Sequence, residues 1–272
     1  RTVAGEWIRR GVPRWVTLID EALFVVTSAI FVQGSLDFFP GVPFDQYVMG
    51  CELFIVGSGL NVALSLFSLA IFLGTLYACL TREWRLEGNG AGGLKGGICV
   101  EAGSADRLGT GLRRMFHWYQ LSKYWEYLDT LFLVLNGKDL SFLHVYHHGV
   151  VAFTSWTWTR GDLRLAAGGV LFNTMVHVFM YYFYFACSIP ELRKRLWWKK
   201  YLTKLQILQF VVALTMAICL WRVHTQSLAS GGPGCAGNNA FVVSTGFNAT
   251  LLLLFVDFHV RSYGSKSDGG SK

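Results

Sequence analysis

Apolar residues fall into long runs along this chain, separated by short polar breaks. A helix needs about 20 mostly apolar residues to cross the hydrocarbon core of a bilayer. Runs of about that length occupy residues 18–38, 57–80, 115–135, 141–159, 163–186, 201–221 and 240–260. The pattern therefore predicts an all-α membrane protein with about seven transmembrane helices.

The polar breaks indicate how the runs are connected. A long Gly-rich loop, 82–114, follows the second run, whereas tight polar turns at 136–139 and 160–162 join the third, fourth and fifth runs. Short connections favour antiparallel neighbours. Successive runs should therefore cross the membrane in alternating directions.

Polar side chains inside four of the runs fall at one depth of the membrane once these directions are followed. They lie late in the third run, early in the fourth, late in the fifth and early in the sixth. Within each run, spacings of three or four residues put them on one helical face. A buried polar chamber is predicted from these residues: Lys123, Glu126, Asp129, Thr130, His144, His147, His148, Asn173, His177, Tyr181, Tyr184, Thr203, Gln206 and Gln209.

Composition supports the membrane interpretation. Hydrophobic residues make up 53% of the chain and charged residues only 15%, whereas a typical soluble domain carries about 25% charged residues. The net charge of +7 favours anionic lipid headgroups and phosphate-bearing ligands over nucleic acid. We expect a single integral-membrane domain over 1–272, with an N-terminal tail at 1–17 and a flexible C-terminal tail at 264–272.

Three of the seven histidines stand close together at the start of the fourth run. His144, His147 and His148 are spaced i, i+3 and i+4, so their rings face the same way on a helix. Burying several titratable rings beside a lysine and two acids costs free energy, which favours a functional role. A lone amide on a membrane helix is more often a contact between helices, and Lys123 with Glu126 can be read as a pair that only steadies the bundle.

Two chemistries could use such a chamber, and the first is iron binding. Membrane desaturases and hydroxylases hold a di-iron site with several histidine boxes, some of the form HxxHH. Here His117, His224 and His259 are isolated, and the four remaining histidines are too few for a site of that kind. We therefore expect no metal and no other cofactor, and keep a membrane di-iron fatty acyl desaturase or hydroxylase as the alternative.

The second chemistry is acyl transfer, in which a histidine acts as nucleophile or base while amide, lysine and tyrosine groups stabilise oxyanions. The mixture of Lys, Asn, Gln and Tyr around the histidines suits this chemistry better. A seven-span receptor or retinal protein is a different class again. A retinal pigment needs a buried lysine in its last span, and the run at 240–260 contains none.

The polar residues belong to four motifs, which read KYWEYLDT at 123–130, HVYHH at 144–148, NTMVHVFMY at 173–181 and TKLQILQ at 203–209. In order and spacing they resemble the four signature motifs of the ELO family of very-long-chain fatty acid elongases. The resemblance extends from about Asn61 to about Tyr263.

That resemblance implies an acyltransferase, a 3-oxoacyl-CoA synthase that joins a long-chain acyl-CoA to malonyl-CoA with loss of CO₂ and CoA. It also implies that spans two to seven surround a buried substrate tunnel, and that the protein lies in the endoplasmic reticulum membrane. Expected partners are membrane lipid and the ketoacyl-CoA reductase, hydroxyacyl-CoA dehydratase and enoyl-CoA reductase of the elongation cycle. A homodimer is compatible with this interpretation.

The chemistry and the resemblance together suggest roles for the histidines. We expect His147 to attack the acyl thioester and form an acyl-imidazole, with His177 assisting from the facing helix. A general-base role for His147, with direct acyl transfer, is the mechanistic alternative. Binding of thioester or carboxylate oxygens is expected of four side chains: Lys123, Asn173, Gln206 and Tyr181.

Other residues would support this centre. Orientation of the reacting histidines is expected of Glu126, Asp129, His144 and His148. Glu126 and Asp129 also count, with Gln209, as candidates for substrate contact. Lys199 and Lys200 lie at the expected mouth, where CoA brings its phosphates. Cys187 and Cys219 stand in apolar runs without a histidine partner and are interpreted as packing residues.

Cysteines and charge bear on the orientation. Cys99 and Cys235 lie in loops on the side opposite the chamber, where they can pair, and a disulfide there would mark that side as the oxidising lumen. Two unpaired loop cysteines are the alternative. This orientation makes the N-terminus lumenal and the C-terminus cytosolic. The basic residues at 193–195 and 199–200 then follow the positive-inside rule, whereas those of the 82–114 loop do not.

Overall fold

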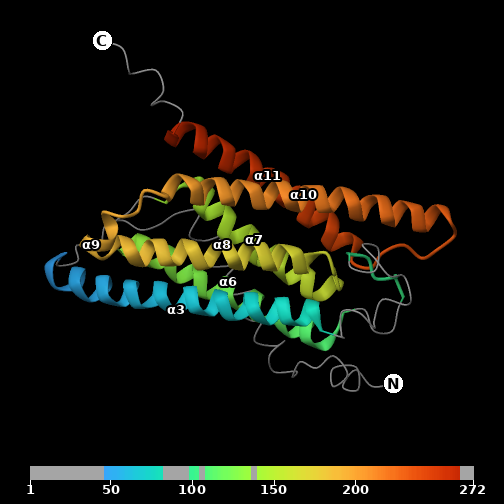
Figure 1. The fold of residues 1–272 in the computed structure, drawn as a ribbon, viewed down its shortest axis with the longest axis horizontal. Coiled ribbons are helices and arrows are strands. Elements are labelled where there is room, and N and C mark those ends of the chain that lie inside the picture. The colour runs from blue at the N-terminus through green and yellow to red at the C-terminus, as the bar shows by residue number, and fades with distance from the viewer. Residues whose placement is uncertain (1–45, 82–97, 104–107, 136–139, 264–272) are drawn as a thin grey trace, which may run out of the picture.

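The computed structural model describes residues 46–81, 98–103, 108–135 and 140–263. These residues form helices α3 (Gln46–Leu80), α6 (Thr110–Leu135), α7 (Phe142–Gly161), α8 (Ala166–Cys187), α9 (Pro190–Arg193), α10 (Lys199–Ala229) and α11 (Asn238–Tyr263) (Figure 1). The all-α prediction is confirmed for this part of the chain. The predicted span at 18–38, the turn at 136–139 and both tails lie outside the described residues.

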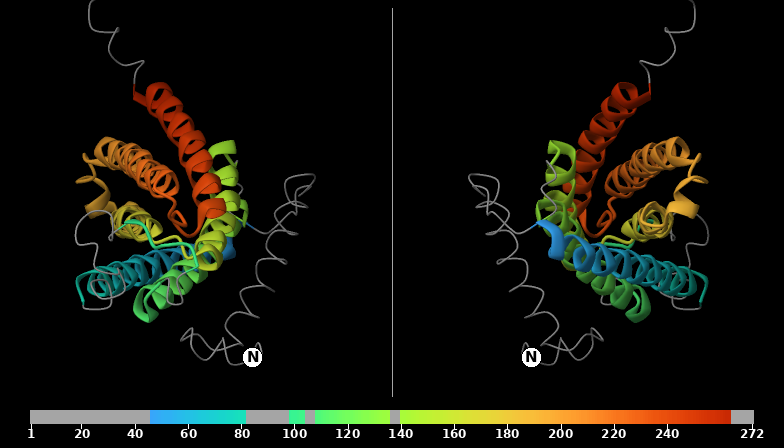
Figure 2. Two further views of the ribbon diagram at one scale, coloured as in Figure 1. Left: turned by 90° about the vertical axis from the view of Figure 1, so that its right-hand side faces the viewer. Right: turned by 90° about the vertical axis from the view of Figure 1, so that its left-hand side faces the viewer.

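Six of these helices close into a ring. Following the contacts from one helix to the next gives the order α3, α6, α7, α11, α10, α8 and back to α3. Figure 2 looks along the bundle and shows these helices around a common axis. They correspond to the predicted spans two to seven, so those spans share one interior.

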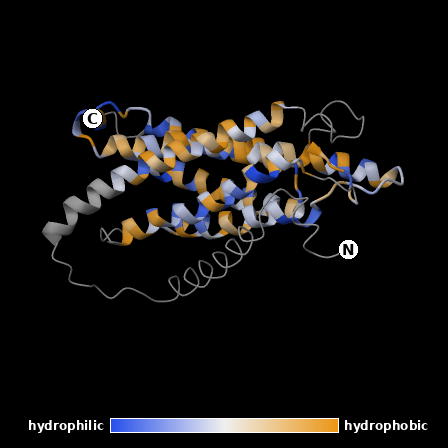
Figure 3. Cartoon of the chain, turned by 90° about the horizontal axis from the view of Figure 1, so that it is seen from below, coloured by the Kyte–Doolittle hydropathy of each residue, from blue (hydrophilic) through white to orange (hydrophobic). Residues whose placement is uncertain are grey.

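The outside of the ring is apolar. Leu66 and Leu73 on α3, Ile218 on α10 and Leu253 on α11 are exposed, whereas charged side chains such as Lys123 are buried in the interior. Hydrophobic residues dominate the helices in Figure 3. This inside-out distribution fits a surface covered by lipid rather than by water.

Four of the described helical segments are long and apolar enough to cross a membrane. They are Gly57–Leu80, Ala166–Cys187, Lys199–Ala229 and Asn238–Tyr263. The chain is therefore a multi-pass membrane protein. Helices α6 and α7 fall below that apolarity because they carry the polar motifs, and α6 alone has Lys123, Glu126 and Asp129.

Local signals fix both ends of α7, the helix that carries the histidine cluster. Ser141 caps its first turn, because the Ser141 hydroxyl accepts a hydrogen bond of 3.2 Å from the His144 backbone N–H. At the other end Asp162 adopts the left-handed conformation with φ 54°. Its carboxylate pairs with Arg113 on α6 at 2.7 Å, so the turn into α8 is tied to the start of α6.

The two ends of the ring differ in character. At one end α6 and α8 finish while α7 and α10 begin; we call this the chamber end. At the opposite end a disulfide joins Cys99 to Cys235, and Glu101 forms an isolated antiparallel bridge with Cys235. We call this second end the disulfide end. Residues 98–102, which lie along 234–236 there, are called the strap.

Candidate functional site

A cavity of about 590 Å³ opens inside the ring at the chamber end, and we call it the chamber. All six helices of the ring contribute to its wall. Its polar lining residues include Asp129, His144, His147, His148, Asn173, His177, Tyr181, Gln206 and Gln209. The four polar segments identified from their depth in the membrane therefore meet at one place.

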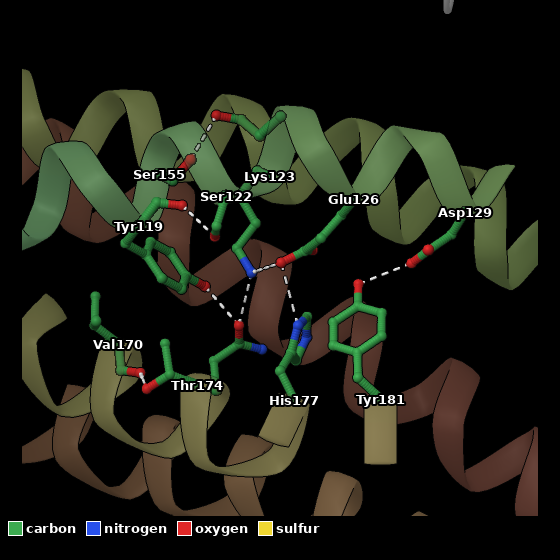
Figure 4. A network of polar contacts seen from close by, with 12 residues as sticks. Tyr119, Ser122, Lys123, Glu126, Asp129, Ser155, Val170, Thr174, His177 and Tyr181 are labelled. Carbon is green, nitrogen blue, oxygen red and sulfur yellow. Dashed lines mark hydrogen bonds and ion pairs between the residues drawn. The ribbon is translucent and has the colours of Figure 1, made fainter. Parts of the chain in front are cut away.

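One wall of the chamber rests on a buried ion pair (Figure 4). The ammonium of Lys123 donates to Glu126 Oε1 at 2.7 Å, and both side chains are at most 2% exposed. The same Oε1 atom lies 3.2 Å from Nδ1 of His177 on α8. Because neither Lys123 nor Glu126 lines the chamber, this pair acts on the cavity only through its neighbours.

Asn173 is the neighbour through which Lys123 reaches the chamber. Its Oδ1 atom accepts a hydrogen bond of 2.9 Å from Lys123 Nζ and another of 2.9 Å from the Tyr119 hydroxyl. Two donors on one oxygen fix which way the amide points. Its NH₂ group is then the part of Asn173, a lining residue, that remains for a ligand.

Tyr119 was not identified from the sequence as a site residue. Its ring stacks on Trp158 with 5.7 Å between centroids, and the indole N–H of Trp158 donates to the Ser244 hydroxyl. Lys123 Nζ lies 4.3 Å from the centroid of the Tyr119 ring. Its position one helical turn before Lys123 was the available signal, because it places both residues on one face.

Asp129 has a partner different from the one expected. The hydroxyl of Tyr181 donates to Asp129 Oδ2 at 2.8 Å, and both residues line the chamber. We expected Asp129 to orient a histidine. The reason for the difference is register: Asp129 lies one turn beyond Glu126 on α6, as Tyr181 lies one turn beyond His177 on α8.

The histidine cluster forms the facing wall. His144 Nε2 lies 2.9 Å from the Thr130 hydroxyl, which anchors α7 to α6. The ring centroids of His144 and His148 are 4.3 Å apart, and those of His147 and His148 are 5.7 Å apart. Three imidazoles from one helix therefore pack against each other at the edge of the chamber.

His147 and His148 carry buried Nδ1 atoms with no hydrogen-bond partner within residues 46–263 as described. The Gln209 side-chain oxygen is in the same state. Buried polar atoms are normally satisfied, so a group of such atoms around one cavity points to a ligand or water that completes them. This is the pattern expected of a binding site.

A second cavity, of about 380 Å³, continues toward the disulfide end. Along a single helix, one stretch of residues lines the second cavity and the next stretch lines the chamber. On α8 the residues that line the second cavity end at Phe172, and those that line the chamber begin at Asn173. On α11 the last residue that lines the second cavity is Asn248, and the first that lines the chamber is Phe255. We call the second space the apolar cavity, because Trp158 and aliphatic residues dominate its wall.

Gln209 lines both spaces. Its side chain is 8% exposed and sits where the polar and apolar walls meet. The two cavities are therefore adjacent parts of one interior.

The remaining candidates lie farther out. Gln206 lines the chamber and its amide approaches the sulfur of Met180 at 3.9 Å. Lys199 and Lys200 are exposed in the first turn of α10 and line neither cavity. Cys187 and Cys219 are free thiols outside both cavities, and Cys219 packs against the core.

All seven histidines belong to the described residues. Within those residues, no group of three or more His, Cys, Asp or Glu side chains is arranged to hold a metal ion. The chamber instead combines histidines with amide, hydroxyl and ammonium donors. The di-iron interpretation gains no support from this arrangement.

Fold and site together define a multi-pass helical membrane protein whose ring of helices encloses a chamber lined by histidines and amides. The sequence matches the GNS1/SUR4 family, ELO, over residues 53–271. The chain belongs to this family. The resemblance to the ELO family is thereby confirmed.

Three relatives illustrate the similarity. A putative fatty acid elongase of Dictyostelium discoideum is 34% identical over 78% of this chain and 67% of its own length. Very long chain fatty acid elongase 2 of Mus musculus is 32% identical over 75% of this chain and 66% of its own length. Very long chain fatty acid elongase 5 of Xenopus tropicalis is 31% identical, with 78% and 66% covered. The chain thus spans about two thirds of the length of these relatives.

Proposed function

We propose that the protein is the condensing enzyme of fatty acid elongation, an acyltransferase that extends a long-chain acyl-CoA by two carbons from malonyl-CoA. One observation carries the proposal: a polar, histidine-lined chamber lies next to an apolar cavity inside the ring of helices, and Gln209 lines both spaces. A molecule with a reactive polar head and a long hydrocarbon tail matches both spaces. The names of the relatives agree with this substrate class.

The apolar cavity suits the acyl tail. Most residues of its wall are apolar, and each buried methylene contributes about 0.8 kcal/mol to binding. The thioester would then stand in the chamber beside His147, and CoA would extend through the chamber end. Lys199 and Lys200 are exposed near that end and suit its phosphates.

His147 is the proposed nucleophile. One of its ring nitrogens attacks the thioester carbon, the carbon–sulfur bond breaks, and the CoA thiolate leaves with the imidazole proton to give CoA and an acyl-imidazole. Malonyl-CoA then loses CO₂, and the electron pair of the broken carbon–carbon bond forms an enolate. The enolate carbon attacks the acyl carbon, the carbon–nitrogen bond breaks, and the imidazole takes up a proton from solvent.

Asn173 and Tyr181 are the proposed donors to the oxygens that gain negative charge. With Oδ1 occupied by Lys123 and Tyr119, the Asn173 amide is preorganised to donate from its nitrogen. Preorganised donors stabilise a developing oxyanion without a cost of reorientation at the moment of reaction. Lys123 and Glu126 are therefore positioning residues in this mechanism, whereas the sequence predicts that Lys123 binds an oxygen of the substrate.

His177 faces the same space from α8, and its Nδ1 atom lies 3.2 Å from Oε1 of Glu126. We assign it the positioning of the malonyl carboxylate or the attacking enolate. If His147 instead acts as a general base, the acyl group passes directly from CoA to the enolate and no acyl-imidazole forms. The two mechanisms differ in one intermediate, which can be trapped.

The cellular setting follows from the same proposal. The protein would lie in the endoplasmic reticulum membrane, with the disulfide end in the oxidising lumen and the chamber end toward the cytosol. The N-terminus would be lumenal and the C-terminus cytosolic. No cofactor is required, because the reaction needs only the two CoA esters and a proton. The reductases and the dehydratase of the cycle would take over the 3-oxoacyl product.

Incubation of the purified protein with carboxyl-labelled malonyl-CoA and a panel of acyl-CoAs tests the function. We expect release of labelled CO₂ that depends on acyl-CoA, together with a 3-oxoacyl-CoA two carbons longer. A desaturase or hydroxylase would instead consume O₂ and leave the chain length unchanged. Absence of labelled CO₂ with every acyl-CoA, from protein that remains folded, would contradict the proposal.

Tyr119→Phe is expected to lower kcat about tenfold while leaving KM nearly unchanged. The change removes one of two hydrogen bonds that orient Asn173, worth about 1.4 kcal/mol at most, but keeps the stack on Trp158. Tyr77→Phe, at an exposed tyrosine of α3, is the matched control and should have no effect.

A double variant tests whether Tyr119 acts through Asn173. In Asn173→Ala the amide is gone, so adding Tyr119→Phe should lower kcat little further. If the two losses multiply instead, Tyr119 affects the reaction by another route. Steady-state kinetics of the four proteins decide between these outcomes.

A further inference from the structure

We propose that Ile98, held in place by the Cys99–Cys235 disulfide, is the stop that sets the longest acyl chain the enzyme accepts. The inference rests on the proposed function, because it takes the apolar cavity to hold the acyl tail. It adds the residue that closes this cavity and the covalent bond that keeps that residue in position. Ile98 and the two cysteines of the disulfide lie outside the four motifs.

Ile98 lines the apolar cavity at the end that is nearest the disulfide. Most lining residues belong to helices of the ring, and the exceptions are Ile98 and 163–165. Residues outside the helices meet a cavity on the axis of a ring only where the helices end. Ile98 and the α7–α8 turn therefore form the end wall, and the turn is fixed by the pair between Arg113 and Asp162.

Ile98 is well packed for a residue outside the helices. Its side chain is 5% exposed and belongs to the same core cluster as Trp158 and Leu163, which also line the cavity. A residue that limits the length of the acyl chain must keep its position when a longer chain enters the cavity. Close packing supplies that resistance, because interiors at native density yield little to an added methylene.

The strap fixes the backbone on the C-terminal side of Ile98. Next to it, Cys99 is bonded to Cys235. The carbonyl of Val100 accepts a hydrogen bond of 2.7 Å from the Ala236 N–H, and the Ala102 N–H donates to the Gly234 carbonyl at 3.0 Å.

The other side of the disulfide is anchored as well. His224 Nδ1 on α10 accepts a hydrogen bond of 2.9 Å from the Cys235 N–H. The disulfide therefore links the backbone beside Ile98 to a position that α10 itself holds. Loss of this bond leaves the backbone beside Ile98 joined to residues 234–236 by two main-chain hydrogen bonds, each of which contributes only about 1 kcal/mol.

The test is the length of the products made from a mixture of saturated acyl-CoAs. Ile98→Ala removes three side-chain carbons from the end wall, so the longest product should gain one two-carbon unit. Ile98→Phe adds three carbons and should shorten the longest product by one unit. Ile218→Ala, the same substitution on the exposed face of α10, should leave the distribution unchanged.

A separate set of measurements tests the role of the disulfide. Cys99→Ser combined with Cys235→Ser should broaden the distribution toward longer products, and treatment of the native protein with a thiol reductant should do the same. Cys219→Ser, at a free thiol outside both cavities, is the control. If only the Ile98 variants shift the lengths, the stop exists without the disulfide and the second half of the proposal is overturned.

The outcomes separate this inference from the proposed function. If the native protein makes no elongated product, the function itself fails. If it elongates and both Ile98 variants keep the native product lengths, Ile98 is not the stop. Misfolding cannot produce opposite shifts in Ile98→Ala and Ile98→Phe, so the pair of changes remains decisive even when either variant loses part of its activity.

Discussion

His147→Ala is expected to abolish condensation, with a fall in kcat of about 10⁴-fold or more, as when a nucleophile or its base is removed from an acyl-transfer enzyme. The loss should be catalytic rather than structural. His147 Nδ1 has no hydrogen-bond partner within the described residues, so its removal breaks no buried hydrogen bond there. The measurement is release of labelled CO₂ by purified protein whose thermal unfolding is followed in parallel.

His259→Ala is the control for this variant. His259 is half-buried on α11, its ring centroid lies 5.0 Å from that of Tyr263, and it lines neither cavity. We expect it to keep native activity. Native condensation by His147→Ala would overturn the assignment of the reacting residue.

An experiment with acyl-CoA alone shows whether His147 acts as a nucleophile or as a general base. Incubated with acyl-CoA alone, the native protein should release one equivalent of CoA and gain the mass of one acyl group on the peptide that contains His147. A general base would release no CoA before malonyl-CoA is added. His147→Ala should show neither the adduct nor the early release of CoA.

Lys123→Met is the second change with a large expected effect. It removes the cation that neutralises Glu126, and both groups are almost fully buried. An uncompensated buried charge of this kind costs about 3–5 kcal/mol, so the free energy of unfolding should fall by about that amount. Activity should fall as well, because Asn173 loses one of its two donors.

Adding Glu126→Gln separates the two effects. The double variant carries neither charge, so most of the lost stability should return. Activity should stay low, since neither Asn173 nor His177 regains its charged partner. Unfolding in mixed detergent, followed by tryptophan fluorescence, gives the stabilities, with Lys194→Met at an exposed lysine as the control. A double variant as unstable as the single one would show that Lys123 stabilises the protein by other means.

The sequence predicted the helices of the ring, and the common depth of their polar residues, with few differences from the structure. Apolar runs locate helices because a membrane span must satisfy its own backbone and cover itself with apolar side chains. The run predicted at 201–221 nevertheless belongs to a helix that reaches Ala229. Helix α10 extends beyond the apolar run because polar residues such as Arg222 and Gln226 can continue a helix once it leaves the hydrocarbon.

The spacing of residues along the sequence could not show which side chains would pair with each other in the chamber. Periodicity places Asp129 and Glu126 on the chamber side of α6, but the register of α8 decides that one meets Tyr181 and the other His177. The direction of the Asn173 amide depends on Tyr119, a residue outside every motif. The apolar cavity could not be predicted from the sequence either. Its wall consists mostly of ordinary apolar residues, and the sequence does not show whether such residues pack against each other or line an empty space.

The closed ring has a kinetic consequence. Throughout the described part of the chain each of the six helices contacts the next, so the ring is closed around its axis. In the proposed reaction, an acyl chain that enters along this axis would thread into the ring with its methyl end first, and the product would withdraw by the same route. Each turnover would then include two passages of a hydrocarbon tail past Gln209, so the residence time of the acyl group would grow with every pair of carbons it gains.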